Sequence, residues 1–281
     1  MQTKKTLVLV LVLALSGCTR ESDAPPGPAA QAQAPTPAPP APSGPTDGPS
    51  GPTDTPAPAG RGVALDAIAP SALSRRSIDV NPFTSEARLV FATESAPFSV
   101  HLAVRVHANA DATREHVSTA RRSVTAPLVP AGELGEGFVA KDAEGRIGYA
   151  LLARHEVTCV ARVTGTLDDQ AASALRSVVD SWRAAVDLAA SAPSPAPAIA
   201  SISPATAPRA GGSGTLLQVA LDPAAPVTYT AYDATGGASV VATRQGPVLH
   251  AGKPGVFKVK VAVATSWLLA TSAETVVEVG P

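Results

Sequence analysis

A cysteine near the start of the chain is the residue whose type and position point most directly to chemistry. Cys18 directly follows Leu15, Ser16 and Gly17, at the end of an apolar run that begins at Leu7. A cysteine thiol becomes a nucleophile when it ionises, so this position can be alkylated. The apolar run follows two lysines and is far shorter than the roughly 20 residues needed to span a bilayer. The pattern predicts an export signal at the N-terminus.

The residues Leu15-Ser16-Gly17-Cys18 resemble the lipobox of bacterial lipoproteins. The resemblance implies that residues 1–17 are a signal peptide recognised at Leu15, Ser16 and Gly17, and that Cys18 is acylated and begins the mature protein. The acylated Cys18 would then hold the protein on a lipid bilayer. Thr19, in place of Asp, resembles the outer-membrane sorting pattern, so we expect an exported, lipid-anchored protein on the outer membrane that faces the periplasm or the surface. The alternative is an ordinary signal peptide with a chance cysteine.

Residues 18–61 are expected to form a disordered tether behind the lipidated cysteine. The sequence has 28 prolines, and 13 of them fall between positions 24 and 60, where aromatic residues are absent. Such a segment has little to bury, so burial cannot offset the entropy lost on ordering. A spacer is the main interpretation; a cell-wall-crossing arm, a Pro-rich ligand and an O-glycosylated stretch are alternatives. A second Pro-rich stretch, 191–198, predicts a short linker.

Residues 62–190 are predicted to form an α+β domain, an antiparallel sheet with helices. Apolar and polar residues alternate over 98–107 and again over 147–153, as in half-buried strands. The same alternation at 157–163 places Cys159 on a buried face. Helices are expected after Asp111, as a cap, and after Thr166, and the second helix carries an apolar stripe that ends at Trp182.

The stretch 78–186 resembles the Mog1/PsbP-like domains in the order of its elements and at three places. These are the Leu89-Val90-Phe91 strand, the Asp142-to-Tyr149 hairpin and the terminal helix with Val178-Val179-Asp180-Ser181-Trp182. Gly148 and Ala150 depart from that pattern. The family shares no catalytic site and its members mostly bind or assist other proteins, so the resemblance implies no catalytic residue here.

The other polar residues that could take part in catalysis or metal binding are expected to have structural roles. His101, Arg105 and His107 share one strand face, but about 20 Å separates the outer two, too far for a single metal. Asp168 and Asp169 suit a helix N-terminus, and the glycines around Glu133 and Glu136 suit a loop. Ser213 lies in a Gly-rich turn without the frame of a serine nucleophile. We therefore predict no catalytic, metal-binding or cofactor-binding residue and no cofactor.

Residues 199–281 are predicted to form a small all-β sandwich. Strands are expected at 216–221, 227–232, 239–243, 248–251, 256–265 and 274–279. The segment from Ala251 to Val259 resembles the strand entry of bacterial Ig-like domains, with Phe257 where many carry Tyr. Ig-like domains serve as spacers, adhesins and binding modules, so this fold does not decide the function.

The net charge of −1 gives no electrostatic case for nucleic acid. The expected function is that of a membrane-anchored envelope lipoprotein, a non-enzymatic binding or scaffolding module. Its expected partners are the lipid bilayer, through Cys18, and an envelope protein or cell-wall component. The alternatives are an accessory or assembly factor for an envelope complex, and an envelope hydrolase with an unrecognised site.

Overall fold

The computed structural model describes residues 62–192, 194–222 and 226–281. The predicted signal peptide, the lipidated Cys18 and the tether of residues 18–61 lie outside these ranges. Within them, neither helix combines the length and the apolar character that crossing a bilayer would require.

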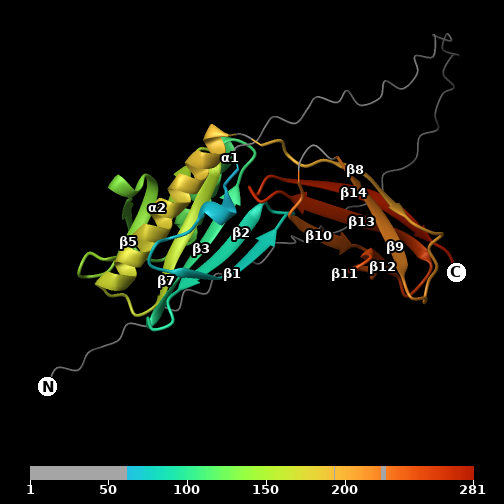
Figure 1. Ribbon diagram of the computed structural model, residues 1–281, viewed down its shortest axis with the longest axis horizontal. Coiled ribbons are helices and arrows are strands. Elements are labelled where there is room, and N and C mark those ends of the chain that lie inside the picture. Colours follow the sequence, from blue (N-terminus) through green and yellow to red (C-terminus); the bar gives the residue numbers. More distant parts are fainter. Residues whose placement is uncertain (1–61, 193, 223–225) are drawn as a thin grey trace, which may run out of the picture. The chain divides into compact units, whose positions relative to one another are not determined.

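A seven-stranded antiparallel sheet forms the first part, in the order β1-β2-β3-β7-β6-β5-β4 (Figure 1). Its strands are β1 (Ser74–Asn81), β2 (Glu86–Ala92), β3 (Phe98–Val106), β4 (Leu128–Pro130), β5 (Glu136–Lys141), β6 (Ile147–Arg154) and β7 (Val157–Gly165). Short 3₁₀ turns precede β1 (Leu65–Ala67) and β5 (Gly132–Leu134). The predicted mixture of an antiparallel sheet with helices is confirmed.

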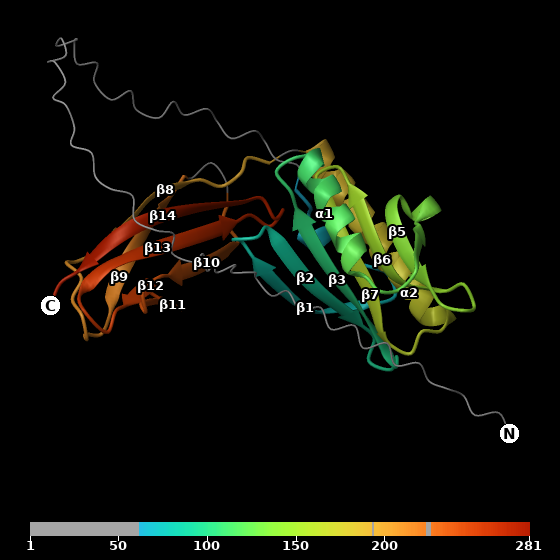
Figure 2. The ribbon, with the colours of Figure 1, turned by 180° about the vertical axis from the view of Figure 1, so that it is seen from behind.

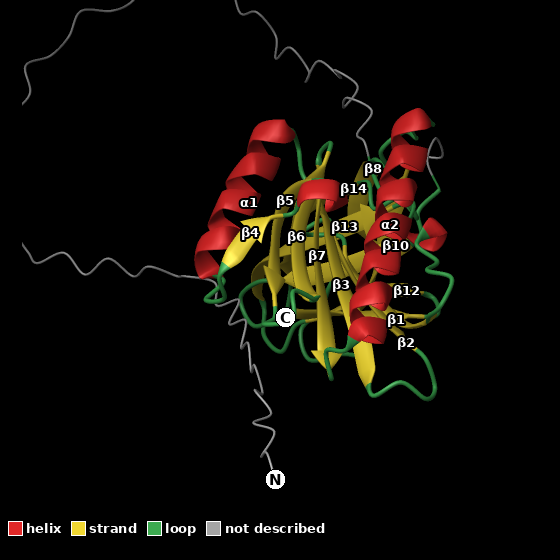
Figure 3. Ribbon diagram, turned by 90° about the vertical axis from the view of Figure 1, so that its left-hand side faces the viewer, coloured by secondary structure: helices red, strands yellow, loops and turns green. Residues whose placement is uncertain are grey.

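Two helices lie against opposite faces of this sheet. Helix α1 (Ala110–Ser123) connects β3 to β4, and helix α2 (Asp169–Ser191) follows β7. Figure 2 shows α1 in front of the strands from one side, and Figure 3 shows the sheet between the two helices. The strand alternation explains the placement, since successive side chains point to opposite faces.

Helix α2 supplies one side of the main core. Its predicted stripe is confirmed, because Ala171, Leu175, Val178 and Trp182 are all buried. They pack on the inward residues of β3, among which Val100, Leu102 and Val104 are buried. The alternation that predicted β3 is therefore confirmed in its burial as well as in its backbone.

Helix α1 packs on the opposite face of the sheet with fewer buried side chains than α2. Thr113 is its one fully buried residue. Its N-cap is Asn109, whose Oδ1 accepts a hydrogen bond from Ala112 N at 2.9 Å. The prediction of Asp111 as the cap was wrong by two residues, because Asn109 already offers the oxygen acceptor that the first turn needs.

Two smaller antiparallel sheets form the C-terminal part. One has the order β10-β13-β14 and the other β11-β12-β9-β8. Their strands are β8 (Ile199–Pro204), β9 (Thr215–Leu221), β10 (Tyr229–Ala234), β11 (Ser239–Thr243), β12 (Gly246–His250), β13 (Gly255–Ala264) and β14 (Ala270–Val279). All six predicted strands are present within a few residues, and β8 is an addition.

The two C-terminal sheets share one hydrophobic cluster. Leu217 and Leu249 come from the four-stranded sheet, whereas Phe257 and Val261 come from the three-stranded one. Along β13 the lysines alternate with these buried residues and are exposed. Up to Val261 the alternation places one face of β13 inside and the other in solvent, whereas Ala262 and Ala264 bury the outer face over the last part of the strand.

Candidate functional site

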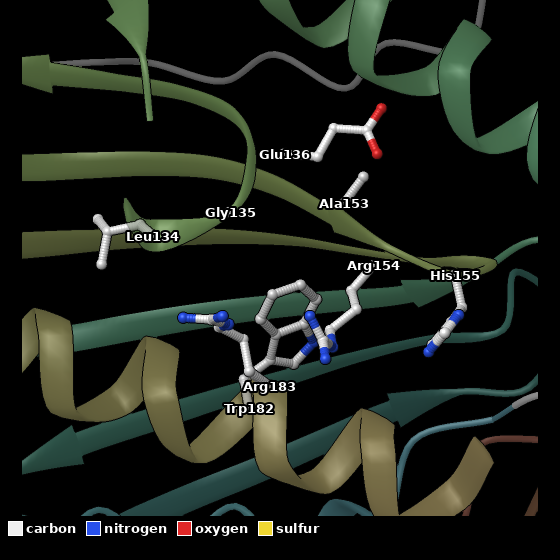
Figure 4. A pocket seen from close by; sticks show the side chains of 8 residues that line it. All are labelled: Leu134, Gly135, Glu136, Ala153, Arg154, His155, Trp182 and Arg183. Atoms are coloured by element: carbon white, nitrogen blue, oxygen red, sulfur yellow. The ribbon is translucent and has the colours of Figure 1, made fainter. Parts of the chain in front are cut away.

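A pocket of about 260 Å³ opens where the end of β6, the start of β5 and the middle of α2 meet (Figure 4). Three polypeptide segments line it. Its residues are Leu134, Gly135, Glu136, Ala153, Arg154, His155, Trp182 and Arg183. This concentration of arginine, histidine, carboxylate and indole groups makes it the candidate functional site.

Close approach of β5 to β6 shapes one wall of the pocket. Gly137 has a φ of +140°, and a Cβ at this position would lie 2.1 Å from the carbonyl oxygen of Leu151. A side chain would therefore push the two strands apart. Gly137 directly follows Glu136, so its lack of a side chain keeps the start of β5 close to the end of β6.

Arg154 forms the firmest polar contact at this site. Its Nε donates to Oδ1 of Asp187 at 2.5 Å, and its Nη2 donates to Oδ2 at 2.7 Å. This forked pair lowers the pKa of Asp187 and raises that of Arg154, mainly through the side-chain hydrogen bonds. Because the bond is bidentate, it fixes the orientation of the guanidinium group between β6 and α2.

Trp182 lines the pocket but keeps its indole N–H buried behind the pocket surface. The side chain is 1% exposed, and its Nε1 has no hydrogen-bond partner among the described residues. Buried indole N–H groups usually have an acceptor. Trp182 was predicted as a core residue of the helix stripe; its burial is confirmed, and its unpaired donor is the feature that the sequence did not reveal.

Arg183 is the second guanidinium of the pocket. Its Nη1 donates to the backbone oxygen of Glu133 at 3.4 Å and lies 3.7 Å from Oδ1 of Asp180. Both contacts are long, so Arg183 is held much less firmly than Arg154. Figure 4 shows the Trp182 indole between the Arg154 and Arg183 side chains, whereas the Glu136 carboxylate points away from all three.

A second pocket, of about 270 Å³, lies under α1 and shares Glu136, Ala153 and His155 with the first. Arg121 of α1 stands over the ring of Phe138, 4.2 Å from its centroid. A cation over an aromatic face is attracted by the ring's quadrupole. The contact helps to hold α1 on the sheet where few of its side chains are buried.

The predicted polar face of β3 is partly covered by α1. The ring of His107 lies 4.9 Å from that of His116 in α1, and its Nε2 shares a 3.0 Å hydrogen bond with Oγ1 of Thr158. Burial, with a smaller effect from His116 and Arg105, lowers the pKa of His107 to about 4. Burial also lowers the pKa of His116, so both rings are neutral near pH 7.

His101 lies farther along the same face. Its Nε2 is 3.0 Å from Oγ of Ser99, and burial and then Arg162 lower the pKa of its ring. Over the ranges that the structure describes, no three His, Cys, Asp or Glu side chains are grouped so as to hold a metal ion.

Cys159 is buried, as its strand position predicted. Burial in apolar surroundings raises the pKa of its thiol. Since the thiolate is the reactive form, this sulfur is a poor nucleophile in the folded protein. The other cysteine, Cys18, lies outside the described ranges.

The remaining candidates occupy the positions predicted for them. Asp168 is the N-cap of α2, and its Oδ1 accepts from Ala171 N at 2.8 Å. Asp169 lies in the first turn of α2. Ser213 is exposed in the turn before β9, beside Gly214 at a φ of +91°. The predicted loop before Phe138 is a 3₁₀ turn followed by β5, which starts at Glu136.

Comparison of the sequence and structure with protein-family models, curated proteins and solved structures finds no match. The assignment of a role therefore rests on the residues themselves. The pocket was not anticipated because its lining comes from positions 134–136, 153–155 and 182–183, none of which forms a recognisable motif. The one available signal was the pair of basic residues Arg154 and His155, directly after the predicted strand over 147–153.

Proposed function

We propose that this protein is a lipid-anchored, non-enzymatic binding module of the bacterial cell envelope. The observation that carries the proposal is Leu15-Ser16-Gly17-Cys18 at the end of a short apolar run. A thiol at that point is the nucleophile that diacylglycerol transfer requires. Two or three acyl groups on one cysteine would anchor the protein stably, where a single one is marginal.

The candidate site supports binding as the activity. The pocket beside Trp182 presents N–H donors of Arg183 next to the guanidinium of Arg154, which its pair with Asp187 holds in place. Fixed donors in a concave surface are suited to recognising a ligand. The thiol that could have acted as a nucleophile, Cys159, is buried with a raised pKa.

The order of the C-terminal strands supports an Ig-like assignment for residues 199–281. When β8 to β14 are taken as strands A to G, the four-stranded sheet runs A-B-E-D and the three-stranded sheet C-F-G. This is the order of constant-type immunoglobulin domains. A domain of that kind is a common spacer or binding module, which agrees with a scaffold at the membrane.

The anchor is tested by the mass of the N-terminal peptide of the full-length protein expressed in an exporting bacterial host. We expect a peptide that begins at Cys18 and carries diacylglycerol, and no such peptide from Cys18→Ser. Cys159→Ser is the matched control, because it removes the other thiol and should leave acylation unchanged. An unmodified Cys18 in the mature wild-type protein would contradict the proposal.

The binding role is tested by crosslinking in intact cells. The wild-type protein should give a crosslinked species at stoichiometric yield, and Arg183→Gln should reduce it. Arg176→Gln is the control, since Arg176 is exposed on the same helix and lies outside the pocket lining. Equal yields from both variants would remove the pocket from the binding surface.

A further inference from the structure

The carboxylate of Glu136 lines the pocket of about 270 Å³ under α1. Glu136 shares its sheet face with Phe138, two residues farther along β5, and with Ala153, its cross-strand neighbour on β6. Figure 4 shows the carboxylate pointing away from Trp182, on the other side of the sheet from α2. No hydrogen bond or ion pair reaches it from any residue that the structure describes. Its negative charge is therefore not balanced within the pocket.

Arg121 brings an opposite charge to the same pocket. Its guanidinium lies over the Phe138 ring, 4.2 Å from the centroid, and donates to no acceptor in the described part of the chain. The ring contact holds this group without using its five N–H donors. Glu136 and Phe138 are two residues apart on one strand face, which corresponds to about 7 Å. Arg121 and Glu136 therefore line one pocket but are too far apart to pair with each other.

The other charged groups of this pocket each have a partner. Arg114 pairs with Asp111, one turn earlier in α1. His155 is the remaining titratable group, and its Nε2 lies 3.8 Å from Oδ1 of Asp187 in α2. The pocket is thus left with one guanidinium and one carboxylate that have no ionic partner within the described ranges.

These two charges restrict which ligands the pocket can accept. A simple anion would be attracted by Arg121 and repelled by Glu136, and a simple cation would experience the reverse. A molecule with one cationic and one anionic end would pair with both groups through charge-assisted hydrogen bonds. Complementary charges of this kind give specificity by rejecting ligands that place like charges together. The pocket therefore favours a zwitterion.

The spacing of the two charges suits an α-amino acid. In such a molecule the ammonium nitrogen and the carboxylate carbon lie about 2.5 Å apart. With a charge-assisted hydrogen bond of about 2.8 Å at each end, the molecule bridges groups about 8 Å apart. This reach is close to the separation of about 7 Å along β5. A dipeptide is longer by about 3.5 Å and would exceed it.

The rest of the pocket leaves room for a small apolar side chain. Ala110, Val117, Ala153 and the ring of Phe138 give part of the lining an apolar surface. The volume of about 270 Å³ is below the range of drug-sized ligands, which begins near about 300 Å³. A molecule of the size of one amino acid is therefore a better match than a cofactor.

We propose that the pocket between α1 and β5 binds a free α-amino acid with an apolar side chain. The carboxylate of the ligand accepts from Arg121, its ammonium group donates to Glu136, and its side chain lies against the apolar part of the lining. This site goes beyond the proposed function, because it requires neither the lipid anchor nor the pocket at Arg183. Its test can therefore fail while the proposed function stands, and the reverse.

The test is isothermal titration calorimetry of the full-length protein in detergent solution with L-leucine, for which we expect saturable binding. N-acetyl-leucine lacks the ammonium group, and leucine amide lacks the carboxylate. Each analogue should bind at least about tenfold more weakly, because it leaves one protein charge unpaired. Hydrogen exchange locates the site: leucine should slow the exchange of α1 amides, because it ties α1 to β5.

Two substitutions remove the two charges. Glu136→Gln and Arg121→Gln should each weaken the binding of leucine by about tenfold or more. Glu115→Gln and Arg176→Gln are the matched controls, because both residues are exposed on helices and lie outside the lining, and they should bind as the wild type does. Arg121→Gln also removes the contact with Phe138, whereas Glu136→Gln removes no contact within the described residues, so the second variant decides the result.

Three results would overturn the proposal. The first is the absence of saturable heat, with unchanged exchange of α1, at leucine concentrations near its solubility limit. The second is equal affinity for leucine and for either analogue that carries a single charge. The third is wild-type affinity for leucine in Glu136→Gln.

Discussion

The two hydrophobic clusters of this protein are built from different side chains. Around the seven-stranded sheet the core combines Trp182, Phe91 and several leucines with the alanines of α2. Between the C-terminal sheets it consists mainly of valines, with Phe257 as its largest member. Both pockets described above, the pair of His107 and His116, and the unpaired indole belong to the first region.

The difference between the two cores explains why both pockets lie beside the seven-stranded sheet. Helices laid on a sheet leave irregular space at strand ends, and long side chains such as Arg154 and Arg183 fill it only in part. Two sheets facing each other interdigitate short side chains across a layer about 10 Å thick. The first region therefore supplies a site, and the second supplies a regular support.

Truncation of Trp182 should have the largest effect on stability. Trp182→Ala should lower the free energy of unfolding by about 3–5 kcal/mol, because it leaves a cavity under α2. Trp182→Phe keeps most of the ring volume and removes an N–H that has no acceptor in the described ranges, so it should change stability by less than about 1.5 kcal/mol. Urea unfolding of both variants, without added ligand, measures these changes. A loss with Trp182→Phe close to that of Trp182→Ala would show that the N–H has a structural partner.

A matched pair of substitutions on β13 tests the packing of the valine-rich core between the C-terminal sheets. Phe257→Ala should cost about 3–5 kcal/mol, because Phe257 is buried between the sheets. Val256→Ala, one residue earlier on the exposed face, should change stability by about 0.5 kcal/mol or less. Thermal unfolding of both variants tests the inward and outward faces assigned to this strand. Similar losses from the two would contradict the comparison of the cores.

Removal of the N-cap of α2 should lower the stability of the protein by an intermediate amount, through the helical region alone. Asp168→Ala removes the acceptor for Ala171 N and should cost about 1 kcal/mol. Asp169→Ala, its neighbour in the first turn, loses attractions to the helix dipole and to Arg146 but no capping hydrogen bond, and should cost less. Chemical unfolding of the two variants separates these contributions, and equal losses would mean that Asp168 acts only through its charge.

The smallest expected effect is a pH dependence from the covered face of β3. Because the pKa of His107 is about 4 in the folded protein and 6.5 without its surroundings, the unfolded state binds more protons between these values. Stability should therefore fall as the pH drops from about 6.5 towards 4. The groups around this ring are His116 of α1, Thr158, and Arg105, with Glu86 acting on His116.

His107→Gln should reduce the fall in the free energy of unfolding between about pH 6.5 and pH 4. Urea unfolding across this pH interval measures the effect. If His107→Gln leaves the pH dependence unchanged, the acid sensitivity arises elsewhere.

Local patterns predicted the elements with one buried face. The alternation of β3 and β13 and the stripe of α2 were all recognised, because each follows the period of its element. Strand β1 was missed because it lies at the sheet edge with most of its residues exposed, and only its second half, from Ile78 to Asn81, alternates apolar and polar residues. Strand β8 was missed for the same reason, since few of its side chains are buried.

The site could not be predicted because it depends on contacts far apart in the sequence. Arg154 and Asp187 are 33 residues apart, and their forked pair exists only after α2 packs on the sheet. Nothing in the local sequence of Trp182 distinguishes an indole with an acceptor from one without. The lipobox pattern points to Cys18 as a modification site, which remains a prediction because it lies outside the described ranges.

Because Cys159 is buried, the reaction of its thiol can report local unfolding of the protein around β7. In the Cys18→Ser variant it is the sole thiol, and it reacts only when β7 separates from its neighbours or its covering helix. Under conditions where reclosing is fast, the rate of alkylation measures the free energy of that opening. A ligand that binds in the pocket lined by Trp182 should slow the reaction, so one thiol would record occupancy of a pocket that it does not line.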